Sequence, residues 1–148
     1  MGNRPEYMAS ALRICVDEVI DGDKDIKGRI CGVAVKEDTE FHGSSELFIL
    51  IDRLLDGIGK PQPSRKSRMF RNVAENDVTS YCVSPEIYHS SDEIREKEGR
   101  LFTRDVLFVS RLRSSWQGVM KDADGRLLGN FDSDLEFIGL LYDRRVTR

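Results

Sequence analysis

The chain has 148 residues and a formal net charge of −3, with 26 acidic against 23 basic side chains. This near balance argues against a general nucleic-acid binder and gives no attraction to an anionic membrane surface. The apolar fraction of 39% and the charged fraction of 33% indicate a globular protein with a densely charged surface, and we expect one domain over residues 1–148. The longest apolar run, 47–51, is far shorter than the roughly 20 residues that span a bilayer. Because the first residues also lack the apolar stretch of a secretory signal, we expect a cytoplasmic protein with no membrane partner.

The first part of the chain predicts two strands and a helix. Apolar and polar residues alternate over 11–20, which is typical of a half-buried strand, and 26–36 predicts a second strand. A turn over 37–39 follows. From Gly43 the apolar positions recur every three or four residues, as they do in an amphipathic helix. Gly59 and the nearby Pro61 predict the end of that helix.

The middle of the chain predicts a linker with little regular structure. Residues 60–72 have the composition of an exposed arm, and 78–83 predict a short strand. Residues 91–99 predict a short polar helix that is capped by Ser91 and ends at Gly99.

The last part of the chain returns to strands and ends in a helix. Residues 101–113 predict a long strand, and 116–120 and 126–131 predict two more on either side of a hairpin turn at 122–125. Ser133 and Glu136 match the capping box, in which each side chain accepts a hydrogen bond from a backbone N–H at the helix start. We expect one face of this helix to carry Leu135, Ile138, Leu141 and Tyr142.

The two ends of the chain match each other at an offset of 90 positions. In both copies a strand, a strand containing Gly, a short return strand, a Phe and a helix start follow in the same order. This predicts an α+β fold of two tandem strand–strand–helix repeats, 11–59 and 101–143, joined by 60–100, in one antiparallel sheet with two main helices packed on one face. The matched pairs are Gly28 and Gly118, Phe41 and Phe131, Gly43 and Ser133, Glu46 and Glu136, and Leu50 and Leu140.

Residues 106–143 carry a pattern of known type. An apolar strand is followed by a Ser-Trp-Gln-Gly step and then by a Phe-x-Ser-x-x-Glu helix start, at Ser115, Trp116, Gln117, Gly118, Phe131, Ser133 and Glu136. This pattern resembles that of a group of small uncharacterised bacterial proteins that are common in clostridial genomes. The chain departs from it at Phe137, where Leu is usual, at Asp132, where a basic residue is frequent, and at Gly139. The resemblance covers about a quarter of the chain and implies the fold unit, because the group has no agreed activity to carry over.

Two features predict binding residues. The most basic stretch, 65–71, contains Arg65, Lys66, Arg68, Phe70 and Arg71, and a positive arm with one aromatic ring can bind RNA, DNA or a nucleotide. A solvated linker is the alternative interpretation of this arm. Trp116, the single tryptophan, predicts either a ligand or partner surface, or a ring that covers the sheet while Gln117 binds backbone at its edge.

The cysteines and histidines give no catalytic or metal motif. Cys15, Cys31 and Cys82 form no CxxC pair, and we expect reduced, buried thiols. A Cys15–Cys31 disulfide requires that their strands pair, and an intracellular setting would keep it open. His42 and His89 are the only histidines, and the sequence contains no nucleophile elbow, P-loop or HExxH motif. We therefore expect no metal and no cofactor.

These observations favour a non-enzymatic binding or assembly protein that acts through self-association, with a homodimer as the default, or through a protein partner. Its sheet is expected to have one face covered by helices and the other more open. A nucleic-acid or nucleotide binder that uses the arm 65–71 is an alternative, although the charge balance does not favour it. A small hydrolase or transferase is a second alternative, and it would need His42 or His89 beside a nucleophile such as Ser44 or Cys82.

Overall fold

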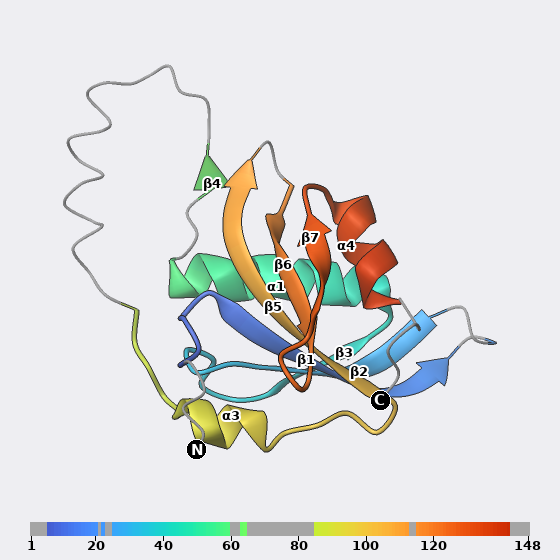
Figure 1. Ribbon diagram of the computed structural model, residues 1–148, viewed down its shortest axis with the longest axis horizontal. Coiled ribbons are helices and arrows are strands. Elements are labelled where there is room, and N and C mark those ends of the chain that lie inside the picture. The colour runs from blue at the N-terminus through green and yellow to red at the C-terminus, as the bar shows by residue number, and fades with distance from the viewer. Residues whose placement is uncertain are drawn as a thin grey trace.

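The computed structural model describes residues 6–20, 22, 25–59, 63–64, 85–112 and 115–142. Within these residues the fold is α+β, and six strands form one antiparallel sheet accompanied by three helices (Figure 1). A two-residue strand, β4 (Pro63–Ser64), pairs in parallel with the end of β5. The other elements are β1 (Ala11–Ile20), β2 (Asp25–Cys31), β3 (Thr39–His42), α1 (Ser44–Ile58), α3 (Ser91–Arg95), β5 (Phe102–Leu112), β6 (Gln117–Asp122), β7 (Leu127–Phe131) and α4 (Asp134–Leu141).

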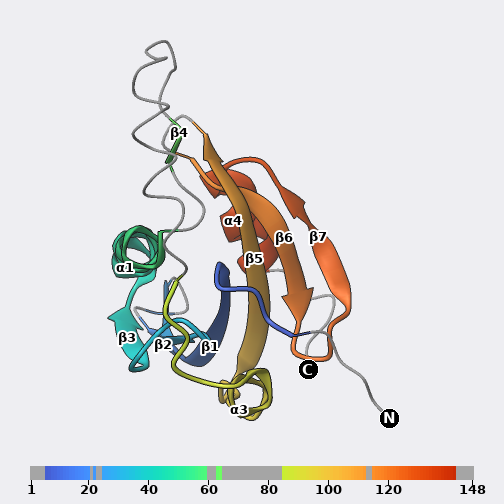
Figure 2. The same cartoon turned by 90° about the vertical axis from the view of Figure 1, so that its left-hand side faces the viewer.

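The strand order places the two halves of the chain side by side. The order across the sheet is β3-β2-β1-β5-β6-β7, so β1 and β5 lie at its centre. We call β1–β2–β3 with α1 the first half, and β5–β6–β7 with α4 the second half. The central pair, β1 and β5, sets Arg13 directly opposite Asp105. Helices α1 and α4 lie on one face of the twisted sheet, which we call the inner face, while α3 lies beside β1 and β2 on the outer face (Figure 2).

The core fills the space between the inner face and the two long helices. Leu12, Ile14 and Val16 alternate along β1 and point into it, which confirms the predicted strand. The predicted half-burial is wrong for this stretch, because Arg13 and Cys15, on the other face, are only 2% and 0% exposed. A later segment of the chain covers them. From the helices the core receives Leu47, Ile51, Leu55, Phe137 and Leu141.

Two glycines allow neighbouring strands to approach closely. A Cβ atom on Gly28 would collide with the carbonyl oxygen of Cys15, and one on Gly118 would collide with that of Leu107. Each glycine lies opposite a phenylalanine on the following strand, Phe41 in β3 and Phe131 in β7. Both rings are almost fully buried. Because glycine has no side chain, each ring can pack over the glycine that it faces.

The starts and ends of helices α1 and α3 partly follow the sequence. Helix α1 ends at Gly59, whose φ of 84° is left-handed, as predicted. Helix α3 is shorter than the predicted 91–99, and its cap is Ser90 rather than Ser91. The hydroxyl of Ser91 instead accepts a hydrogen bond from the backbone N–H of Tyr7, and this contact ties the N-terminal segment to α3.

Helix α4 confirms its predicted cap and corrects its predicted face. The Ser133 hydroxyl accepts a hydrogen bond from the N–H of Glu136, but the Glu136 carboxylate accepts from Asp132 rather than from Ser133. Leu135 is 82% exposed, so its assignment to the buried face was wrong. Phe137 and Leu141 are the buried residues, and a position two residues before Phe137 lies on the opposite side of a helix with 3.6 residues per turn.

Candidate functional site

Residues 85–100 lie over the outer face of the first half, and we call them the cover segment (Figure 2). Its main apolar contact is Ile94 of α3, which is 1% exposed and packs with Cys15, Cys31 and Val33. The expectation of one open sheet face therefore fails for this half, since part of the segment interpreted as a linker packs on it.

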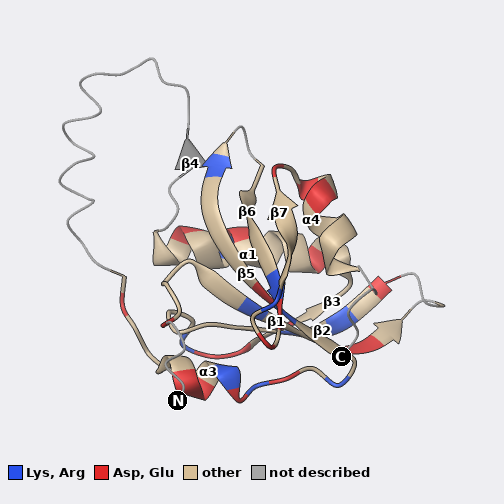
Figure 3. Cartoon of the chain, viewed as in Figure 1, with Lys and Arg blue, Asp and Glu red and all other residues tan. Residues whose placement is uncertain are grey.

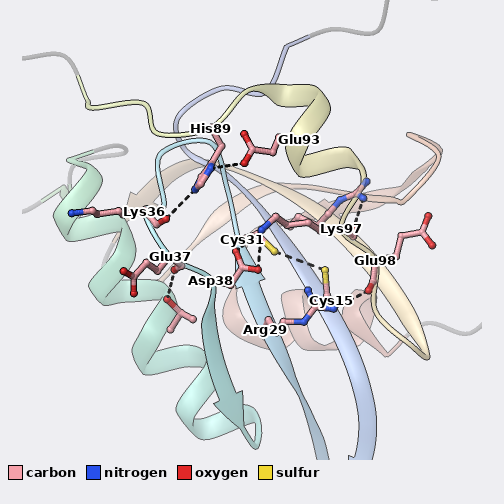
Figure 4. Close-up of polar contacts among 12 residues, drawn as sticks. Cys15, Arg29, Cys31, Lys36, Glu37, Asp38, His89, Glu93, Lys97 and Glu98 are labelled. Carbon is pink, nitrogen blue, oxygen red and sulfur yellow. Dashed lines mark hydrogen bonds and ion pairs between the residues drawn. The ribbon is translucent and has the colours of Figure 1, made fainter.

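Polar contacts fix both ends of the cover segment (Figure 4). At one end, the backbone N–H groups of Tyr88 and His89 donate to the carbonyl of Val33. At the other, the Lys97 ammonium lies 3.0 Å from both carboxylate oxygens of Asp38. The Arg29 guanidinium donates to the carbonyl of Glu98 at 2.9 Å. These contacts hold the segment against β2 and the loop that follows it.

Arg13 joins the cover segment to the centre of the sheet. Its Nε donates to the Asp105 carboxylate at 2.8 Å, and its Nη1 donates to the carbonyls of Arg95 and Lys97 at 2.9 and 2.7 Å. Burial disfavours the charged guanidinium, but the hydrogen bond and charge of Asp105 outweigh it and raise the pKa of Arg13. The Tyr7 hydroxyl also donates to Asp105 at 2.8 Å, and burial together with that carboxylate raises the pKa of Tyr7 to about 12.

Beneath the cover segment lies a pair of thiols. Cys15 and Cys31 are free and fully buried, as expected, and their Sγ atoms are 4.0 Å apart. The hydrogen bond with Cys31 lowers the pKa of Cys15, and against the opposing effect of burial the charges of Arg29 and Arg13 lower it further. The same contact, together with burial, raises the pKa of Cys31. The third cysteine, Cys82, lies outside the described residues.

Both histidines have partners in the structure. The ring of His89 is held by the Lys36 carbonyl at Nε2 and by Glu93 at Nδ1, both at 3.0 Å. The contact with Lys36, followed by that with Glu93, raises the pKa of His89 despite some desolvation. His42 has a side chain that is 57% exposed, and its Nδ1 lies 3.5 Å from Glu46. None of these partners is a serine or cysteine nucleophile. A pairing of either histidine with Cys82 lies outside the described residues.

Of the sequence-predicted binding residues, the described part of the chain contains Trp116 alone. Trp116 is 3% exposed, and its ring packs edge-on against Phe48 and Phe137 while its Nε1 donates to Asp52 at 2.8 Å. Gln117 accepts a hydrogen bond from the backbone of Leu112, as the alternative interpretation of this step expects. Binding through Trp116 stays a prediction. The remaining candidates lie outside the described residues, and these are Arg65, Lys66, Arg68, Phe70 and Arg71.

On the outer face of the second half, Tyr7 contacts Asp105, but apolar side chains further along the strands are largely exposed, and we call this part of the face, around Leu107, Val109, Val119 and Leu127, the open face. Leu107 pairs with Val119, and Val119 pairs with Asn130, so their side chains share this face. Leu107 and Val119 are half-buried, whereas Val109 and Leu127 are each 59% exposed. Figure 3 shows uncharged ribbon along most of β6 and β7. Sequence analysis missed this patch because alternation along β5 and β6 gives no sign of which face another segment will cover.

Two searches of the described part of the chain found nothing. No group of three or more His, Cys, Asp or Glu side chains is placed to hold a metal ion there. No helix there is long and apolar enough to cross a membrane. In the comparisons with known proteins, no protein-family model, no curated protein and no solved structure matches the chain. The resemblance of 106–143 to the clostridial group therefore stays a prediction, and function is argued from the geometry alone.

Proposed function

We propose that the protein is a non-enzymatic binding protein that self-associates as a homodimer through the open face of β5, β6 and β7. One observation carries the proposal: the outer face of the first half is covered by the protein's own chain, whereas that of the second half leaves Val109 and Leu127 each 59% exposed. Clustered apolar side chains on a sheet face mark an interaction surface more often than an unused one.

The scaffold of this proposal is a duplicated β-β-β-α unit. The sequence offset of 90 positions recurs as equal strand registers, since Gly28 pairs with Phe41 as Gly118 pairs with Phe131. Glu46 accepts a hydrogen bond from the backbone N–H four residues before it at 2.7 Å, and Glu136 does the same at 2.7 Å. These equalities join residues on separate elements, so they support a repeat more strongly than matched letters do.

A contact with exchanged partners also supports the repeat. In the first half, Asp25 on β2 accepts a hydrogen bond from the backbone of Ser44, the first residue of α1, at 2.7 Å. At the matching positions of the second half the residue types are exchanged, and the Ser115 hydroxyl lies 3.4 Å from the carboxylate of Asp134, the first residue of α4. The same two positions are therefore in contact in both halves. The aspartate lies on the strand side of the contact in the first half and at the helix start in the second.

The repeat identifies the counterparts of the covered face. A two-fold axis between β1 and β5 would pass beside Arg13 and Asp105, which are direct partners. The next pairs on the outer face are Cys15–Arg29 in the first half and Leu107–Val119 in the second. Such an axis would relate these two pairs to each other. The open face is thus the counterpart of a face that the protein elsewhere keeps covered.

A second copy of the chain is the occupant that this surface fits best. An apolar patch complements itself, and a two-fold contact brings the same patch from both protomers together. Pairing through a sheet edge is less suitable, because the edge strands β3 and β7 have only 4 and 5 residues, and short edges limit such pairing. Lys121, which pairs with Asp105, would lie at the rim of the contact, where its charge stays hydrated.

Light scattering coupled to size-exclusion chromatography tests the proposal. At roughly 50 micromolar, a range in which weak dimers form, we expect twice the monomer mass of 16.9 kDa. The double variant V109K/L127K should be monomeric and folded, because both side chains are 59% exposed in the single chain, and its unfolding midpoint should equal that of wild-type protein diluted until it is monomeric. The matched control is Leu135→Lys, which changes a residue 82% exposed on α4 and should stay dimeric. A monomeric wild-type protein overturns self-association, and a dimer that survives the double variant overturns the choice of face.

A further inference from the structure

We propose that Cys15 and Cys31 form a reversible disulfide within the folded chain, which makes the thiol pair under the cover segment an oxidation site. The inference stands apart from self-association, because the thiol pair lies in the first half and the open face in the second.

The position of the two thiols favours a bond between them rather than with another molecule. β1 and β2 are hydrogen-bonded neighbours in which Cys15 lies opposite Arg29 and Cys31 lies opposite Arg13, so the cysteines are diagonal neighbours on one face. Their sulfur atoms are 4.0 Å apart and both side chains are fully buried. A disulfide needs the sulfurs about 2.05 Å apart. Rotation of the side chains and a small shift of the strands therefore have to close a gap of roughly 2 Å.

The surroundings give the two cysteines different roles. Arg29 lies directly opposite Cys15 on the neighbouring strand, where its positive charge favours a thiolate. Cys31 lies opposite Arg13, whose charge is already paired with Asp105, so burial with Val33 and Ile94 keeps its proton on longer. Asp17 opposes this separation only in part, since it is paired with Arg29, whereas Asp38 adds to it by raising the pKa of Cys31.

The reaction balances with a hydroperoxide as the oxidant. The Cys15 thiolate attacks the distal oxygen of the O–O bond and becomes a sulfenic acid, and the leaving oxygen departs as an alkoxide or hydroxide that takes up a proton. The Cys31 thiol then attacks the sulfenic sulfur and loses its proton, and the departing hydroxide takes that proton to leave as water. Two thiols lose two electrons in total, and the peroxide bond gains them.

The cover segment controls access to the thiols. Since neither sulfur is exposed, an oxidant reaches Cys15 only when residues 94–99 move away. The contacts that resist this movement are the Lys97–Asp38 ion pair and the hydrogen bond from Arg29 to Glu98. Removing the Lys97–Asp38 ion pair should speed oxidation while Arg29 and Arg13 stay beside the thiols.

The experiment uses the full chain with Cys82→Ser, so that only the two candidate thiols remain. After treatment with dilute hydrogen peroxide in native buffer, we expect intact-mass spectrometry to find a monomer lighter by about two hydrogens, with no thiol left to alkylate after denaturation. Dithiothreitol should restore both thiols. Adding Cys15→Ser or Cys31→Ser should abolish the loss of two hydrogens. Two thiols that remain titratable, or a cross-linked dimer as the main product, would overturn the proposal.

Two matched variants test the role of the cover segment. Lys97→Met removes the ion pair with Asp38 and should speed disulfide formation about two- to fivefold, the effect of losing one partly exposed pair. Arg53→Met removes a charge of the same sign from an exposed position on α1, which packs on the other face of the sheet, and should leave the rate unchanged. If instead the rate rises with urea as steeply as global unfolding does, oxidation occurs only in the unfolded chain and the proposal fails.

Discussion

The two halves of the sheet differ in how their outer faces are covered. In the first half, the cover segment packs Ile94 onto Cys15 and Cys31 and fixes itself through Arg13, Arg29 and Lys97. In the second half, the face around Leu107 and Val119 has no such layer among the described residues. The difference teaches that two neighbouring halves of one antiparallel sheet can present their outer faces once as interior and once as surface.

In the covered half, a buried charge needs compensating partners. Arg13 has a side chain only 1% exposed, and it is tolerated there because Asp105 and two backbone carbonyls satisfy it. No such network is needed on the open face, where side chains can meet water. Substitutions of buried residues in the covered half should therefore lower the unfolding free energy much more than substitutions on the open face.

The largest effect is expected from Asp105→Ala. This change leaves the buried guanidinium of Arg13 without its carboxylate, which should cost about 3–5 kcal/mol of unfolding free energy in urea titrations. Asp92→Ala is the matched control, because that carboxylate pairs with Arg95 but its side chain is 93% exposed, and its loss should cost less than about 1 kcal/mol. Equal costs for the two variants would contradict the importance of burial.

The next effect compares the two outer faces directly. Ile94→Ala removes an apolar side chain that is 1% exposed and should cost about 2–5 kcal/mol, either globally or as faster hydrogen exchange of 85–100 alone. Leu127→Ala on the open face should stay within about 0.5 kcal/mol under conditions where the protein is monomeric. A low cost for Ile94→Ala with unchanged exchange would mean that the cover segment does not depend on it.

A smaller effect compares the two helix starts. Ser133→Ala removes the side-chain cap of α4 and should cost about 1 kcal/mol. Helix α1 has Gly43 at this position and no side-chain cap, and the Asp25 carboxylate takes the N–H of Ser44 instead. We therefore expect Asp25→Ala to cost at least as much. An Asp25→Ala variant as stable as wild type would show that α1 does not need this acceptor.

The smallest effect is a pH dependence of the cover segment. The pKa of His89 is raised in the folded protein, so its charged ring stabilises the fold fully below the ordinary pKa of about 6.5. That contribution is lost as the pH rises through the raised value. Hydrogen exchange of 85–95, corrected for its intrinsic pH dependence, should therefore quicken over this range. His89→Asn should remove the change, and a wild-type profile identical to that of the variant would refute the role of this histidine.

The sequence by itself determined the order and type of most elements. Alternation placed Leu12, Ile14 and Val16 on one face of β1, Gly59 ended α1, and Ser133 began α4. These features are local: hydrogen bonds and side-chain directions within a few residues decide them, so a window of sequence contains the cause.

Only the tertiary structure decided what covers each face. Arg13 and Cys15 alternate with apolar residues as exposed positions do, yet they are buried by a segment more than 70 residues later in the chain. Leu135 and Phe137 both suit an apolar helix face, and the docking of α4 on the sheet selected Phe137. The periodicity of apolar residues shows which face of a helix or strand differs in polarity from the other. The burial of each face depends on which distant segment packs against it. For that reason the burial of Arg13 and the division of the outer face into a covered and an open half could not be predicted from the residues around them.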